Sequence, residues 1–291
     1  MRIDSHHHLW DPTRASYPWL TDDLAVINRT FTTHDLRVAT EANGIDATVL
    51  VQTHGSLDET IEFLQTEAPV AGVVGWVDLT APHVADTIAQ VMHGPNGRRL
   101  VGIRHKVHDE ADADWLDRTD VRRGIEAVAA AGLVFDLLVR TRELPAATRL
   151  AAAMPQCQFV LDHLAKPPLT EAADSSAMVA WSAALRSLAA HNNVSAKVSG
   201  LVTEADWSTW TPDVLRPAAD VALEAFSPDR LMFGSDWPVS LLAASYSTVV
   251  ETFDNMFAHL SPAELTAMHG TNAQRVYKLD LNQRHFGATK Q

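Results

Sequence analysis

Two segments near opposite ends of the chain carry residues that can bind a metal ion or transfer a proton. His6 and His8 lie in an apolar run near the N-terminus, and Asp236 follows another near the C-terminus. Side chains two residues apart on a strand point to one face, about 6–7 Å apart, so both imidazoles can reach one metal ion or one water molecule. His7 is predicted to point to the opposite face. Titratable groups at the ends of buried strands are costly unless they have a purpose. We therefore expect a closed fold that joins the first and last strands.

Eight short apolar runs recur along the chain, and most are continuous, as in strands buried on both faces of a parallel sheet. Each gap between them is long enough for a helix and two loops, as a parallel crossover requires. Helix starts are predicted after Ser56, Thr211 and Ser261. We predict an α/β fold, a (β/α)8 TIM barrel, as a single domain over residues 1–291, with residues 11–33 as a long first loop over the barrel mouth. The predicted strands are Arg2–Trp10, Ala47–His54, Val73–Leu79, Leu100–Val107, Val134–Arg140, Gln158–Ala165, Val194–Gly200 and Arg230–Pro238.

Polar residues stand at or near the ends of all these strands, where the chemistry of a barrel collects. His163 is favoured as functional because the same barrel carries the His6/His8 pair and Asp236. Asp162 is predicted to point out of the barrel and to cap a helix or form an ion pair. The alternatives are packed core histidines, an N-cap role for Asp236, and salt bridges between strand ends. The other residues at strand ends are Gln52, His54, Trp76, Asp78, Arg104, His105, Asp136, Arg140, Lys166, Lys197 and Ser199.

Composition narrows the class of protein. The formal net charge of the 291-residue chain is −13, which disfavours nucleic acid or an anionic membrane as partner. The single cysteine, Cys157, excludes an intrachain disulfide and is predicted to have a packing or surface role. No apolar run approaches the length of about 18 residues that a membrane helix needs. We therefore expect a cytoplasmic enzyme.

Six motifs occur in an order that is typical of one superfamily. They are Asp4–Trp10, Ser56–Thr60, Val101–His105, Phe159–Pro168, Phe233–Pro238 and His269–Tyr277. On these residues the chain resembles the amidohydrolase superfamily and, within it, the amidohydrolase-2 branch of sugar lactonases. The resemblance covers nearly the whole chain. It implies a TIM-barrel hydrolase of carboxylic esters that opens L-fucono-, L-rhamnono- or galactonolactones, related to 2-pyrone-4,6-dicarboxylate lactonase.

The resemblance also shows a departure in the metal ligands. Amidohydrolases with two metals carry a bridging lysine or glutamate and two further histidines on the middle strands, whereas Val134–Arg140 contains neither lysine nor histidine. A binuclear site is therefore not expected. The residues His6, His8, His163 and Asp236 would suit one Zn²⁺ or Mn²⁺ with an open position. Some relatives of this branch are thought to work without metal, and both cases stay open here.

The expected reaction is attack of water on a lactone carbonyl. Asp236 would accept the proton of water and return it to the departing ring oxygen. Without a metal, His6, His8, His163 and Arg104 would polarise the carbonyl. The residues expected to bind the substrate are Gln52, Trp76, Asp78, Arg104, His105, Lys166 and Lys197. The alternatives are a metal-dependent nonoxidative decarboxylase of the same superfamily, and a protein that binds a sugar acid without turnover. The identity of the lactone, its ring size and the oligomeric state stay open.

Overall fold

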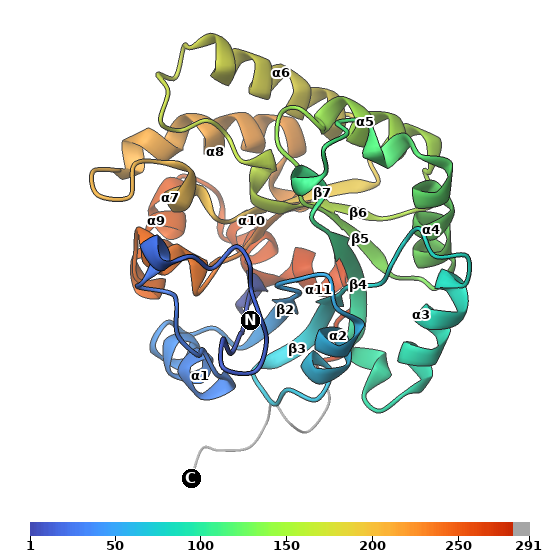
Figure 1. Cartoon of the computed structure of the whole chain (residues 1–291). Helices are drawn as coiled ribbons and strands as arrows, with labels where there is room; N and C mark the ends of the chain where they lie inside the picture. The colour runs from blue at the N-terminus through green and yellow to red at the C-terminus, as the bar shows by residue number, and fades with distance from the viewer. Residues whose placement is uncertain (282–291) are drawn as a thin grey trace.

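The computed structural model describes residues 1–281 and forms a (β/α)8 barrel (Figure 1). Eight parallel strands follow one another around the barrel in chain order. The ring closes between the first and last strands, where His8 N–H donates to the carbonyl of Trp237 at 2.7 Å and Asp236 N–H donates to that of His6 at 2.8 Å. The strands are β1 (Ile3–His7), β2 (Ala47–Val51), β3 (Val70–Gly75), β4 (Leu100–His105), β5 (Val134–Leu137), β6 (Phe159–Leu161), β7 (Val194–Val198) and β8 (Leu231–Phe233).

Helices surround the strands on the outside of the barrel (Figure 1). The predicted starts after Ser56, Thr211 and Ser261 are confirmed, and the hydroxyls of Ser56 and Ser261 accept backbone N–H groups of the first turn. The α-helices are α1 (Thr33–Ala42), α2 (Leu57–Phe63), α3 (Val84–His93), α4 (Thr119–Ala130), α5 (Leu144–Ala153), α6 (Ser176–Ala189), α7 (Leu201–Glu204), α8 (Pro212–Phe226), α9 (Tyr246–Met256), α10 (Pro262–Thr266) and α11 (Asn272–Val276).

The inner wall of the barrel changes from apolar to charged along the strand direction. Val134, at the amino end of β5, packs in an apolar cluster inside the barrel that also contains Tyr277, the residue after α11. Asp136, two residues later and therefore on the same face, is fully buried and lies beside Arg104 in the register of β4 and β5. A barrel interior is a packed core. The apolar side chains towards the amino ends of the strands therefore support a layer of polar side chains that faces the carboxyl ends.

The observed strands end earlier than predicted. The chain leaves β6 after Leu161 and β8 after Phe233, whereas the apolar pattern extends both strands by several residues. The cause is local, because residues with left-handed backbone angles follow both strands, His163 with a φ of 52° after β6 and Asp236 with a φ of 56° after β8. Most of the polar residues at strand ends thus lie in the loops that follow the sheet.

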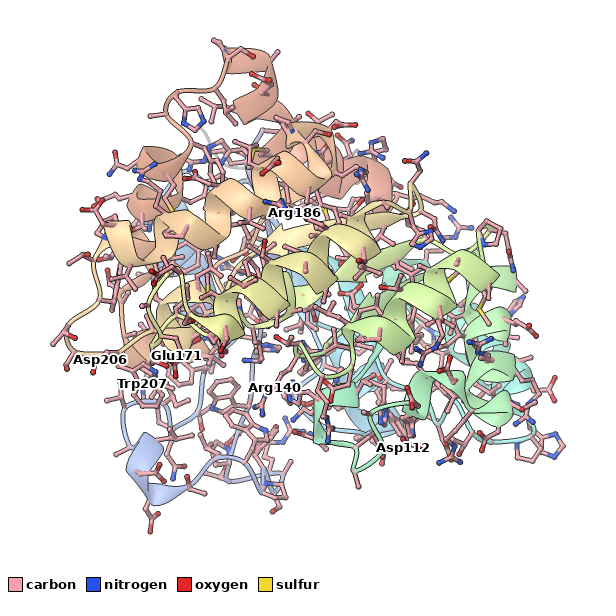
Figure 2. All side chains as sticks on the ribbon, turned by 90° about the horizontal axis from the view of Figure 1, so that it is seen from above. Asp112, Arg140, Glu171, Arg186, Asp206 and Trp207 are labelled. Atoms are coloured by element: carbon pink, nitrogen blue, oxygen red, sulfur yellow. The ribbon has the colours of Figure 1, made fainter. Side chains whose placement is uncertain are left out.

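Loops that follow several strands gather at one end of the barrel. Figure 2 shows Arg140, Glu171, Asp206 and Trp207 on the side of the molecule that carries the first loop. Within that loop, the ring of Tyr17 contacts the ring of His54, which follows β2, with 5.1 Å between centroids. That residues 11–33 cover the mouth stays a prediction. Among residues 1–281, no helix is both long and apolar enough to cross a membrane, and the cytoplasmic location also stays a prediction.

Candidate active site

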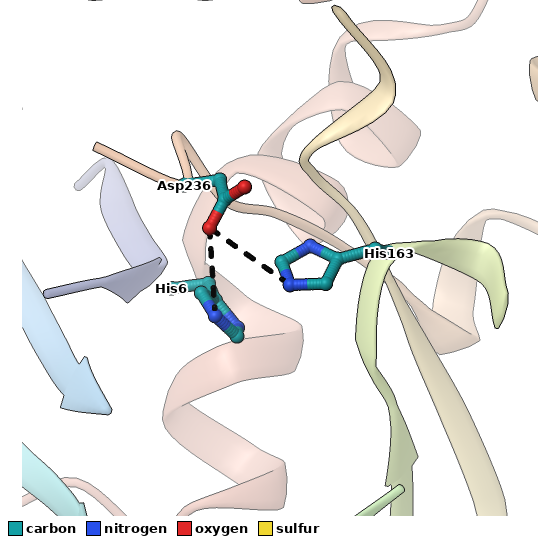
Figure 3. A group of neighbouring side chains, drawn as sticks. All are labelled: His6, His163 and Asp236. Carbon is teal, nitrogen blue, oxygen red and sulfur yellow. Dashed lines mark ion pairs between the residues drawn. The ribbon is translucent and has the colours of Figure 1, made fainter. Parts of the chain in front are cut away.

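Three imidazoles and one carboxylate converge at the carboxyl end of the barrel, and Figure 3 shows two of the imidazoles, His6 and His163, with Asp236. The Nε2 atoms of His6, His8 and His163 lie 3.8, 3.6 and 3.8 Å from Oδ1 of Asp236. The Nε2 atoms of His6 and His8 lie 3.2 Å apart. All four residues are buried. Closure of the barrel thus brings together the residues that the sequence places at opposite ends of the chain.

A buried carboxylate on the first strand helps to fix this arrangement. Asp4 accepts hydrogen bonds from the backbone N–H of Ser235 at 2.8 Å, its hydroxyl at 2.6 Å and the hydroxyl of Tyr246 at 2.9 Å. It also accepts the backbone N–H of His6 at 3.1 Å. Asp4 therefore ties the residue before Asp236 to the strand that carries His6. Sequence reasoning assigned no role to Asp4 or Tyr246, although Asp4 begins the first motif.

His163 is positioned by an unusual turn that follows β6. His163, Leu164, Ala165 and Lys166 have φ angles of 52°, 50°, 60° and 54°, and such left-handed conformations cost roughly 1–2 kcal/mol per residue. The turn directs His163 towards Asp236, and Nδ1 of His163 lies 2.9 Å from the hydroxyl of Ser199. Strained backbone persists where the surrounding structure holds it, and such residues cluster at functional sites.

The prediction that Asp162 points out of the barrel is wrong. Its carboxylate is fully buried and lies 3.0 Å from Arg104 NH1, 2.9 Å from Lys197 Nζ and 3.2 Å from His6 Nδ1. The prediction assumed that strand alternation continues through His163. Because β6 ends at Leu161, the left-handed turn allows Asp162 and His163 to face the interior together.

Gly200, which follows β7, allows the close approach of two of these residues. Its φ angle is 65°, and a Cβ atom there would lie 2.7 Å from Nδ1 of His163 and 2.9 Å from Oδ2 of Asp236. Neither neighbour is free to retreat, because both are buried in the cluster. A glycine at this position is therefore required on two grounds, its backbone conformation and the space available.

A charged layer lies beneath the imidazoles. The ammonium of Lys197 donates to Asp136 Oδ2 at 2.6 Å and forms an ion pair with Asp162 at 2.9 Å. Tyr277 Oη also donates to Asp136, at 2.8 Å from Oδ2. The side chain of Lys197 is 0% exposed, so its ammonium is held entirely by protein groups.

Several predicted substrate-binding residues are engaged by other protein groups. His105 accepts the indole N–H of Trp76 at Nδ1 (3.3 Å), lies 2.7 Å from Glu110 at Nε2, and stacks on Trp115. Trp76 and His105 thus contact each other. Asp78 is exposed and accepts hydrogen bonds from Thr80 in a turn.

The remaining candidates lie closer to the centre. Arg104 pairs with Asp162 and donates to the backbone carbonyl of Gln52. The side-chain amide of Gln52 is buried, and neither of its polar atoms has a hydrogen-bond partner among residues 1–281. Lys166 pairs with Glu204, and its side chain is 20% exposed. The roles of all the predicted substrate-binding residues stay predictions.

Burial sets the protonation of the cluster. It lowers the pKa of His8 to about 3 and that of His163 to about 4, and it holds the pKa of His6 well below its usual value. All three rings are therefore neutral near pH 7, and each has one nitrogen with a free lone pair. Burial raises the pKa of Asp236, and positive charge nearby, on His163 when its ring is protonated and on Lys166, opposes this shift.

The cluster fits a divalent metal ion. His6, His163 and Asp236 offer ligand atoms that all lie within 4.8 Å of one another, and neutral imidazoles with a carboxylate are a donor set that zinc prefers. His8 lies beside this group. Its Nδ1–H donates to the carbonyl of Val51 at 2.8 Å, which leaves the lone pair on the Nε2 atom that faces Asp236. Such hydrogen bonds orient metal-ligating histidines.

Comparison with known proteins gives close relatives over nearly the whole chain. The family described as Amidohydrolase matches residues 3–279. A protein of Burkholderia multivorans named L-fucono-1,5-lactonase is 42% identical over 96% of both chains, and one of the same name from Burkholderia ambifaria is 37% identical over 96% of both chains. A crystal structure of a Burkholderia multivorans amidohydrolase with bound zinc superimposes with a TM-score of 0.91 at 40% identity, covering 96% of this chain and 100% of that one.

Proposed function

We propose that this chain, which belongs to the amidohydrolase family, hydrolyses the ring ester of a sugar-acid lactone, with L-fucono-1,5-lactone as the first candidate substrate. The name of the two relatives that are 42% and 37% identical supports this choice. The structural observation that carries the proposal is the placement of Asp236 within 3.8 Å of three neutral imidazoles. That arrangement suits proton transfer at an ester carbonyl.

The proposed reaction has one nucleophile, water, and one proton carrier, Asp236. The water oxygen forms a bond to the lactone carbonyl carbon while Asp236 accepts a proton from the water. The bond between that carbon and the ring oxygen then breaks, and Asp236 returns the proton to the ring oxygen. The product is an open-chain hydroxy acid. Burial raises the pKa of Asp236, which makes it a stronger base than an exposed carboxylate, and a positioned base contributes about 10²–10⁴-fold.

Of the three cationic side chains among the predicted substrate-binding residues, Lys166 is the most accessible to solvent and therefore to a substrate. The side chains of Arg104 and Lys197 are 3% and 0% exposed, whereas that of Lys166 is 20% exposed. The charge of Lys166 also acts on both His163 and Asp236. We therefore propose that Lys166 binds the substrate near its reacting ester, and that Glu204 holds the lysine side chain in place.

We propose that His6, His8, His163 and Asp236 hold one divalent metal ion. The zinc in the relative that is 40% identical supports this assignment, as do the donor types and spacing of these residues. A bound cation would supply Lewis-acid polarisation of the ester carbonyl. Asp236 keeps its role as proton carrier in this description, and the residues that surround it fix its orientation.

A lactone panel tests the proposed function. Purified protein is assayed with a pH indicator against 1,4- and 1,5-lactones of L-fuconic, L-rhamnonic and L-galactonic acids, and the product is identified by mass. We expect saturable acid release with at least one of them. Saturable binding without acid release would favour the alternative of a protein that binds a sugar acid without turnover. Release of CO₂ from an aromatic acid, without lactone hydrolysis, would replace the proposal by the decarboxylase alternative.

A further inference from the structure

Lys197 contacts His6 from below, on the side opposite the open end of the barrel. Its Nζ atom lies 3.1 Å from Nδ1 of His6, in addition to its contacts with Asp136 and Asp162. An ammonium group has three N–H donors and no acceptor. The three neighbours, all fully buried, account for all three donors of Lys197.

Nδ1 of His6 has two neighbours that demand opposite states of the ring. Lys197 can only donate, so its bond at 3.1 Å requires a lone pair on Nδ1. Ionised Asp162 can only accept, and its Oδ1 atom lies 3.2 Å from the same nitrogen. Oδ1 of Asp162 also lies 2.9 Å from Nζ of Lys197, and its second lone pair can accept the Nδ1–H of His6. A neutral imidazole carries one N–H, and its position therefore decides which neighbour is satisfied.

When Nδ1 of His6 carries the lone pair and Nε2 the proton, the ring completes a continuous chain of hydrogen bonds. The Val51 carbonyl accepts Nδ1–H of His8 at 2.8 Å, so the Nε2 atom of His8 carries a lone pair. His6 can donate its Nε2–H to that atom across 3.2 Å. The chain then runs from Lys197 through His6 and His8 to Val51, while Arg104 Nη1, which lies 3.3 Å from Nε2 of His6, keeps Asp162 as its acceptor at 3.0 Å. In this state, however, Nε2 of His6 carries a proton and cannot bind a metal ion.

We propose that Lys197 and Asp162 are positioning residues that select the tautomer of His6 and thereby set the metal affinity of the site. Lys197 stabilises the Nε2–H form, which bonds to His8 and keeps the cluster ordered without a cation. Asp162 stabilises the Nδ1–H form, which frees the lone pair of Nε2 for a divalent ion in place of the N–H of Arg104 that lies 3.3 Å away. Binding of the ion therefore requires the proton of His6 to change nitrogen. The inference concerns the His6 ring and holds whichever lactone is hydrolysed.

The tautomer can be observed directly in the unmodified protein. The full chain is labelled with ¹⁵N-histidine, stripped with a chelator, and examined by long-range ¹H–¹⁵N correlation before and after addition of one equivalent of Zn²⁺. A His6→Gln variant identifies the signals of His6. We expect the Nε2–H form without zinc and the Nδ1–H form with it. The same tautomer in both states, or a doubly protonated ring without zinc, would overturn the proposal.

Variants test the two neighbours separately, with zinc affinity measured by competition with a chromophoric chelator. Asp162→Asn should weaken zinc binding about 10–100-fold, the usual effect of losing a partner of a metal-ligating histidine. The double variant Lys197→Met with Asp136→Asn removes one charge of each sign. It should tighten zinc binding by about tenfold, because the donor that stabilises the Nε2–H form of His6 is lost. Lys278→Met, at an exposed lysine, is the matched control and should leave it unchanged.

These variants can be read even where one of them fails to fold. Circular dichroism establishes which proteins are folded, and the tautomer measurement on the unmodified chain stands without them. Unchanged zinc affinity in a folded Asp162→Asn protein, or weaker binding in the folded double variant, would contradict the assignment. Since neither measurement uses a lactone, failure of the proposed lactonase activity would leave the result intact.

Discussion

Asp4 accepts the backbone N–H of Ser235 at 2.8 Å, across the seam where the first and last strands meet. The two residues are 231 positions apart in the chain, and each lies next to or near a member of the cluster of imidazoles and Asp236. The Asp4 carboxylate thus links the two strands at this seam and helps to position His6 and Asp236.

Asp236→Asn should abolish turnover while the fold is retained. The amide cannot accept the proton of water, and loss of a positioned base lowers kcat by about 10²–10⁴-fold. The measurement is kcat on the best lactone of the panel, with circular dichroism to establish folding. Asp174→Asn, at an exposed position, is the control. A variant that keeps more than a tenth of the activity would remove Asp236 as the base.

Tyr246→Phe should destabilise the protein through the Asp4 carboxylate. The substitution removes a hydroxyl that donates to Asp4 at 2.9 Å, and loss of a partner of a buried charged group costs about 1–3 kcal/mol. Urea unfolding at pH 7 measures the loss of unfolding free energy. A change below about 0.5 kcal/mol would show that Ser235 and the backbone suffice to hold Asp4.

The stability loss in Tyr246→Phe should depend on pH. Burial raises the pKa of Asp4 to about 6, and hydrogen bonds from Ser235, His6 and Tyr246 oppose this shift. Because the pKa of Asp4 in the folded protein lies above the ordinary value of 3.8 for this side chain, the stability contribution of protonated Asp4 is complete below about pH 4 and is lost as pH rises through 6. Removing the Tyr246 donor penalises only the ionised form further. The destabilisation should thus be larger at pH 7.5 than at pH 5, and the opposite order would contradict this account.

Gly200→Ala should be much more disruptive than Gly44→Ala. Both glycines have left-handed φ angles, 65° and 64°, but a Cβ at Gly44 meets nothing within 4 Å. Gly44→Ala therefore measures backbone strain alone, about 1 kcal/mol. Gly200→Ala adds a clash with His163 and Asp236 and should also weaken zinc binding. Equal effects of the two variants on unfolding free energy and zinc affinity would show that the cluster can move aside.

Zinc should bind with a stoichiometry of one. β5 offers no histidine or lysine, and Lys197 lies between Asp136 and Asp162, where its charge opposes a second cation. Elemental analysis after dialysis against zinc gives the ratio, and the melting temperature should rise with zinc because binding favours the folded state. His163→Ala should lose most of both effects. Two tightly bound ions per chain would contradict the charge argument.

Lys166→Met should weaken substrate binding more than it slows the chemical step. The lysine is partly exposed and its charge acts on Asp236, so its loss should raise KM by about 10–100-fold, the value of a charged hydrogen bond. The assay is steady-state kinetics on the best lactone, with Lys278→Met as the control. An unchanged KM would return Lys166 to a purely structural ion pair with Glu204.

The sequence by itself determined the barrel and predicted the four residues that the structure brings together and that we propose as the catalytic centre. Apolar strands buried on both faces leave a continuous pattern, and their carboxyl ends meet on one face of the closed sheet. The sequence therefore predicts that four residues lie together, because each stands near the carboxyl end of a predicted strand: His6, His8, His163 and Asp236.

Only the tertiary structure decided what surrounds that centre. Strand alternation predicts side-chain direction up to the last strand residue, and the left-handed turn after Leu161 reversed the prediction for Asp162. The ion pairs of Lys197 join residues 61 and 35 positions away. A buried charge is stable only beside its partner, and three-dimensional packing alone chooses that partner. Lys197 lies beneath His6 for this reason, and its predicted role in substrate binding stays a prediction.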